Sequence, residues 1–152
     1  MSAVSLRRAT EADVRTIVEM LADDPLGAAR EDLSEPLAAG YLDAFGAIDA
    51  DPNQLLAVAE RDGEIIGTLQ LTFIAGLSRK GALRGQIEAV RVAAPARGIG
   101  LGSQMIDWAV EECRARGCAT VQLTSDASRT DAHRFYERLG FKASHLGFKR
   151  TL

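Results

Sequence analysis

The sequence has no apolar run long enough to cross a bilayer, and no apolar segment of the signal-peptide kind follows Met1. We therefore expect a cytoplasmic protein without a membrane partner. Cysteine is scarce: the two residues, Cys113 and Cys118, match neither a zinc pair nor a redox Cys-x-x-Cys motif, so we expect reduced, partly buried thiols. Histidines, cysteines and carboxylates show no metal-ligand spacing, so we predict no metal site.

An excess of positive charge is also missing. The net charge is −3, which argues against a general nucleic-acid binder. The charge is uneven, because residues 19–51 contain nine acidic side chains and one arginine, whereas residues 79–116 carry seven basic and four acidic ones. This distribution suits an anionic ligand beside a cationic one, although ordinary solvated helix faces explain the acidic segment equally well.

Apolar periodicity predicts an alternation of strands and helices. Thr10 to Asp13 has the form of a capping box, and Asp62-Gly63 that of a hairpin turn. We expect strands at 3–8, 55–60, 65–73, 85–92 and 119–125, helices after Asp13 and at 31–48, 100–116 and 130–139, and an extended piece near 142–151. The predicted fold is α/β, of the α+β kind: a mixed sheet flanked by helices, in a single domain over residues 1–152.

The most informative segment runs from a β-branched strand through Pro95 into three alternating glycines that open a helix. Glycine lets backbone N–H groups approach an anion, and a helix N-terminus attracts one. A dinucleotide-binding loop is excluded, because the sixth position counted from Gly98 is Ser103, and a Walker A loop would need a lysine before that serine. We predict that an anion binds Arg97, Gly98, Ile99, Gly100, Leu101, Gly102 and Ser103.

The glycine loop has the form Arg97-x-x-Gly100-x-Gly102, and further along the chain a predicted helix ends in Tyr136-x-x-x-Gly140-Phe141. In this order, the two motifs resemble the acyl-CoA pyrophosphate loop and the second signature of the GNAT acetyltransferase superfamily. The resemblance implies a GNAT-like fold, acetyl-CoA as cosubstrate, and N-acetyl transfer by direct attack in a ternary complex. It also implies that Val90, Arg91 and Val92 offer backbone groups to the pantetheine arm and the thioester.

By the same resemblance, Tyr136 is the general acid that protonates the leaving thiolate, and Glu88 is the base, acting through water. A core aromatic is the alternative for Tyr136, and a surface glutamate paired with an arginine is the alternative for Glu88. Asp126 is an alternative base or ammonium ligand, or else a loop cap. His145 is a candidate substrate contact. A covalent cysteine route is not expected.

One position departs from the family pattern. Many members have asparagine seven residues before the tyrosine, whereas this chain has Arg129, for which a CoA phosphate is a candidate partner. The last third of the chain resembles the aminoalkylphosphonate acetyltransferase branch, which implies a small primary amine as acceptor. Relatives are commonly homodimers. The sequence leaves two other functions open, a protein or peptide acetyltransferase and a noncatalytic acyl-CoA sensor. It also leaves open whether the activity requires a metal.

Overall fold

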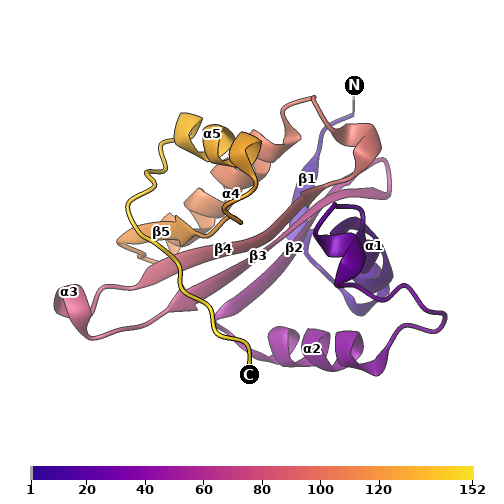
Figure 1. Ribbon diagram of the computed structural model, residues 1–152, viewed down its shortest axis with the longest axis horizontal. Coiled ribbons are helices and arrows are strands. Elements are labelled where there is room, and N and C mark those ends of the chain that lie inside the picture. The colour runs from indigo at the N-terminus through magenta and orange to yellow at the C-terminus, as the bar shows by residue number, and fades with distance from the viewer. Residues whose placement is uncertain (1) are drawn as a thin grey trace.

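The computed structural model describes residues 2–152 and contains a five-stranded sheet in the order β1-β2-β3-β4-β5 (Figure 1). The strands are β1 (Ser5–Arg8), β2 (Gln54–Arg61), β3 (Glu64–Ile74), β4 (Arg84–Val92) and β5 (Thr120–Leu123). Neighbours from β1 to β4 are antiparallel, whereas β4 and β5 are parallel. The expected mixed sheet is confirmed.

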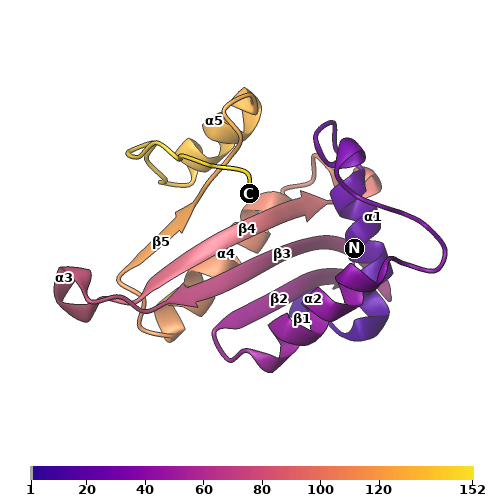
Figure 2. The same cartoon turned by 60° about the horizontal axis from the view of Figure 1, so that its bottom comes forward.

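Helices cover both faces of the sheet (Figures 1 and 2). They are α1 (Val14–Ala22), α2 (Ala39–Ala50), α3 (Ser78–Gly81), α4 (Leu101–Ala115) and α5 (Thr130–Arg138). The first two lie on one face, α4 and α5 lie on the other, and α3 is a short turn between β3 and β4. None of the helices in the described part of the chain combines the length and apolar character needed to span a bilayer.

The main core lies between the sheet and α4. Alternate residues of β3, including Leu69 and Leu71, point to this face and are buried with Met105 of the helix. Two glycines allow close contact: a Cβ at Gly67 would lie 2.6 Å from the Met105 Sδ, and one at Gly85 would lie 2.3 Å from the Cys113 Sγ. Because these two glycines have no side chain, α4 can pack closely against the sheet.

The local turn signals are confirmed. The Asp13 carboxylate accepts a hydrogen bond from the Thr10 backbone N–H at 2.8 Å, as a capping box requires. A 3₁₀ turn over Glu11–Asp13 then leads into α1. Asp62 and Gly63 have φ values of 54° and 78°, which join β2 to β3 by a tight hairpin.

Two expectations for the less regular segments need correction. The helix predicted over 31–48 begins only at Ala39, because Pro36 disfavours helical geometry at Glu35 and lies inside the expected span. Residues 142–151, expected as an extended piece, form no hydrogen-bonded strand in the described chain, and their side chains are exposed. Leu146 and Phe148 are 84% and 91% exposed, so no core packing holds this segment.

Candidate active site

The glycine loop presents a row of unused backbone donors. Gly98 and Gly100 both have φ of 83°, a left-handed conformation that glycine adopts without strain, and the latter is the N-cap of α4. Among the described residues, no N–H from Gly98 to Ser103 donates to a backbone carbonyl. The series of helical bonds begins at the Gln104 N–H, 3.2 Å from the Gly100 carbonyl oxygen. These donors face outward at a helix N-terminus, an arrangement that suits phosphate groups.

Arg97 precedes this row and is already held by neighbouring groups. Its Nε donates to the Val92 carbonyl at 3.1 Å, and its terminal nitrogen lies 3.2 Å from the Asp23 carboxylate. The side chain is half exposed, so its charge stays accessible from solvent. These contacts connect the glycine loop to the loop between α1 and α2.

The carboxyl-terminal half of β4 is distorted and lacks a neighbour on one side. Thr68 pairs with Arg91 and Gln70 with Glu88, so Ala89 and the next residue form a β-bulge, with a φ of 53° at Ala89. The register with β5 ends at the pair Ile87 and Leu123. Residues 88–92 therefore have no strand beside them on that side, and the two strands part (Figure 2). Backbone groups of the predicted residues Val90, Arg91 and Val92 lie along this opening.

Tyr136 lies on α5 between the rings of Phe135 and Phe141, at centroid distances of 5.1 and 6.0 Å. Burial raises the pKa of the Tyr136 phenol, and the positive charges of Arg91 and Arg129 act in the opposite direction. In the part of the chain that the structure describes, the phenol oxygen has no hydrogen-bond partner. The hydroxyl is therefore protonated near neutral pH and free to donate to a reacting group.

A charged cluster beside this tyrosine was not anticipated from the sequence. Two guanidinium nitrogens of Arg129 donate to the Asp24 carboxylate at 2.6 and 2.7 Å, and Arg91 lies 3.9 Å from the same group. The hydrogen bonds from Arg129 hold the pKa of Asp24 far below its usual range. The Arg91 Nε is buried without a partner among the described residues. Asp24 and Arg129 lie 105 positions apart, and no pattern in a single sequence pairs residues over that distance.

This cluster bears on the expectation for Arg129. Its guanidinium is engaged with Asp24, where the sequence suggested a CoA phosphate as partner. The ion pair joins the loop after α1 to the start of α5, so it fixes the position of the segment that carries the tyrosine. A contact between Arg129 and a phosphate stays a prediction.

The two candidate bases have different surroundings. Glu88 is exposed on β4, and within residues 2–152 its carboxylate forms no hydrogen bond or ion pair, so the predicted arginine partner is not found. Asp126 accepts hydrogen bonds from the Ser128 N–H at 3.0 Å and from the Ser128 hydroxyl at 2.6 Å. These bonds lower the pKa of Asp126 and match the loop-capping alternative. Of the two, Glu88 has the free carboxylate.

Two further residues lie outside this arrangement. His145 is exposed in the carboxyl-terminal segment, where its Nδ1 lies 2.7 Å from the Ser144 hydroxyl. Within residues 2–152, no hydrogen bond or ion pair joins it to the cluster around Tyr136. Cys113 is buried, and burial raises the pKa of its thiol to about 11. A buried neutral thiol is a poor nucleophile, as the expectation against a covalent route requires.

The chain resembles acetyltransferases in sequence and in fold. A model of the acetyltransferase (GNAT) family matches residues 15–141. Aminoalkylphosphonate N-acetyltransferase of Salmonella typhimurium is 38% identical over 112 residues, which cover 74% of this chain and 72% of that protein. A crystal structure described as a transcriptional regulator from Bacillus halodurans C-125 is 49% identical, with a TM-score of 0.96, and covers 99% of this chain and 100% of that one. A putative acetyltransferase from Agrobacterium tumefaciens C58 is 26% identical, with a TM-score of 0.85, over 97% of this chain and 99% of that one.

Proposed function

This chain belongs to the GNAT family and is an acetyl-CoA-dependent acyltransferase, and we propose that it acetylates the primary amine of a small molecule by direct attack within a ternary complex. One observation carries the proposal: the unused backbone N–H groups from Gly98 to Ser103, called the amide row below, lie beside the opening along β4. A ligand with its pyrophosphate at the amide row and an extended arm along the opening has the shape of acetyl-CoA.

The residues present fit that cosubstrate. Backbone N–H groups at the start of α4 would hold the pyrophosphate, with Arg97 beside them. Backbone groups on the open side of residues 88–92 would bond the pantetheine amides as a neighbouring strand does. The carbonyls of Val90 and Val92 already accept hydrogen bonds from the Arg91 and Arg97 side chains, at 2.9 and 3.1 Å, so a ligand would share or replace these bonds. A backbone N–H in this segment would polarise the thioester carbonyl and stabilise the oxyanion that forms when the amine attacks.

Two side chains would then transfer the protons of the reaction, one as donor and one as acceptor. The departing thiolate needs a proton, and the Tyr136 phenol can donate one because nothing in the described protein occupies it. The ammonium must lose a proton before it attacks, and the unpaired Glu88 carboxylate can accept it through water. The nitrogen loses a second proton as the amide forms, and this proton replaces the one that Tyr136 gives to the thiolate. Asp126 is the less favoured base, because Ser128 already uses its carboxylate. Holding the two reactants together supplies much of the rate, since it removes the entropy cost of their encounter.

The acceptor is tested with an assay of thiol release from acetyl-CoA over a panel of amines. Aminoalkylphosphonates belong in the panel because the Salmonella relative is named for them, together with alkylamines, polyamines, amino acids and peptides. Turnover of small amines with little turnover of peptides supports the proposal. Turnover of peptides alone would favour a peptide acetyltransferase, and CoA binding without any turnover would favour a sensor.

The assembly and location expected from the sequence stay predictions. A homodimer is supported by the exposure of Leu146 and Phe148, which a second copy could cover. Size-exclusion chromatography with light scattering measures that state directly, and a monomer at working concentration would contradict it. Cell fractionation tests the cytoplasmic location, and limited proteolysis tests whether residues 1–152 form one domain.

A further inference from the structure

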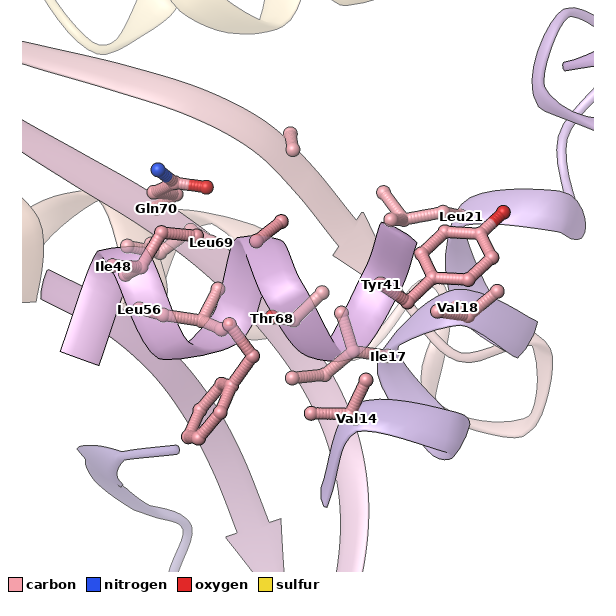
Figure 3. A pocket seen from close by; sticks show the side chains of 13 residues that line it. Val14, Ile17, Val18, Leu21, Tyr41, Ile48, Leu56, Thr68, Leu69 and Gln70 are labelled. Carbon is pink, nitrogen blue, oxygen red and sulfur yellow. The ribbon is translucent and has the colours of Figure 1, made fainter. Parts of the chain in front are cut away.

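An apolar cavity lies next to the β4 bulge, between α1, α2 and the sheet (Figure 3). Its volume is about 150 Å³, and ten of the thirteen residues that line it are apolar. Ile17 and Leu21 come from α1, Phe45 and Ile48 from α2, and Ala89 from the bulge itself. A preformed apolar cavity of roughly this size is large enough to take a benzene ring.

The helix above the cavity is incompletely packed. No residue of α2 is buried, although Phe45 and Ile48 are directed toward the sheet side. Helices of globular proteins usually bury an apolar stripe. Phe45 packs against the buried cluster that contains Ile17 and Val58, so α2 already contacts the sheet, and a ligand in the cavity would bury more of its apolar side.

Polar groups on the cavity wall are already used, with one exception. The Tyr41 hydroxyl donates to the Glu31 carboxylate at 2.9 Å, and the Thr68 hydroxyl donates to the Ala57 carbonyl at 2.9 Å. The amide nitrogen of Gln70 donates to Gln54 at 2.9 Å, which leaves the Gln70 Oε1 as an unused acceptor among the described residues. A charged or hydroxylated group inside would lose water without gaining partners.

The unused acceptor lies beside the predicted base. Gln70 and Glu88 are register partners on adjacent strands, so their side chains share the sheet face that carries the cavity. Both offer oxygen acceptors, and Figure 3 shows the Gln70 amide at one end of the cavity. An amine bound here would have its N–H groups at the rim and its substituent among the apolar side chains.

We propose that the acceptor is a primary amine with an apolar substituent, of the size of a phenyl ring or a branched alkyl chain, which fills this cavity while the amine lies between Gln70 and Glu88. The inference rests on the proposed N-acetylation and narrows its substrate class. It predicts that burial of apolar surface, rather than recognition of a second charged group, selects the acceptor.

The first test uses the unaltered protein and a graded series of amines. Burying one methylene contributes about 0.8 kcal/mol, which is roughly a fourfold gain in kcat/KM. We expect kcat/KM to rise by about this factor per added carbon from ethylamine to isopentylamine, and phenethylamine to exceed ethylamine by at least about tenfold. Ethanolamine, putrescine and 2-aminoethylphosphonate should fall below the apolar amines. The opposite order would overturn the inference.

The second test fills the cavity. Ala44 and Ala47 are both exposed residues of α2, but only Ala44 lines the cavity. Ala44→Phe therefore places a ring at the cavity, and Ala47→Phe places the same ring away from it as the matched control. We expect Ala44→Phe to lower the ratio of kcat/KM for phenethylamine to that for ethylamine by about tenfold or more, and Ala47→Phe to leave this ratio within about twofold. Equal ratios in all three proteins would overturn the inference.

The two proposals fail in different ways. If CoA binds and no amine in either series is acetylated, the proposed function fails and this inference falls with it. If polar or anionic amines are acetylated in preference to apolar ones, N-acetylation stands and only the apolar acceptor is refuted. The series on the unaltered protein decides the question even if Ala44→Phe does not fold, which thermal melting would show.

Discussion

Replacing Tyr136 by phenylalanine separates its chemical role from its role in packing. The substitution removes only the hydroxyl and keeps the ring that contacts Phe135 and Phe141 at 5.1 and 6.0 Å. Because that hydroxyl has no hydrogen-bond partner in the described chain, its removal leaves no partner unsatisfied. The free energy of unfolding should change by less than about 0.5 kcal/mol.

The effect on turnover should be far larger. A positioned general acid contributes about 10²- to 10⁴-fold, so the kcat of Tyr136→Phe should fall by at least about 10²-fold, a barrier increase of roughly 3 kcal/mol. Burial raises the pKa of Tyr136 above its ordinary value of 10.0, so the unaltered enzyme should lose activity through this group only at more alkaline pH. The residual activity of the variant should lack that alkaline limb.

Three measurements make the comparison complete. Thiol release from acetyl-CoA gives kcat across pH, calorimetry gives the affinity for CoA, and urea unfolding gives stability. We expect a loss in kcat with CoA affinity and stability unchanged. Unchanged kcat would refute the acid assignment and leave Tyr136 as a core aromatic, whereas equal losses in stability and activity would identify a structural role.

Further predictions concern the stability of the site. Asp24→Asn should lower the free energy of unfolding by about 1.5–3 kcal/mol near pH 7, because it removes the charged bonds with Arg129. The folded pKa of Asp24 lies below its ordinary value of 3.8, so its stabilising effect is present above that pH and declines as pH falls below it. Urea unfolding should therefore show the difference between the two proteins shrinking toward about pH 3, and a constant difference would contradict the ion-pair account. Gly85→Ala should destabilise by about 1–3 kcal/mol, because its Cβ would lie 2.3 Å from the buried Cys113 Sγ. Gly46→Ala is the control, because apart from the neighbouring backbone of its own helix no atom lies within 4 Å of the new Cβ. Equal thermal midpoints for the two variants would refute the packing argument.

Local chemistry explains which parts of the fold were predictable. The capping box before α1 and the hairpin at Asp62-Gly63 depend on a few adjacent residues, so their patterns are specific. The prediction of a helix over 31–48 was wrong at its start, because Leu33 belongs to an apolar periodicity that Pro36 interrupts. The proline has a larger effect there than the apolar periodicity, since it restricts the backbone conformations that the residue before it can adopt.

The same difference applies to the site: features formed by residues close in sequence could be predicted, and features formed by distant residues could not. The amide row depends on Gly98, Gly100 and Gly102, which are close in sequence, so its form was predictable. The ion pair between Asp24 and Arg129 arises only when the loop after α1 meets the start of α5. The bulge at Ala89 could not be predicted from the sequence either, because it depends on the register between β3 and β4. An alanine gives no sign in the sequence that its φ will be positive.

The central claim is that the backbone from Gly98 to Ser103 binds a pyrophosphate and so places a thioester beside Tyr136. A crystal structure of the protein with CoA tests it most directly. The account predicts pyrophosphate oxygens within about 3.2 Å of several of these N–H groups and the CoA sulfur in the opening between β4 and β5. Pyrophosphate bound elsewhere on the protein, with these amides still facing solvent, would contradict it.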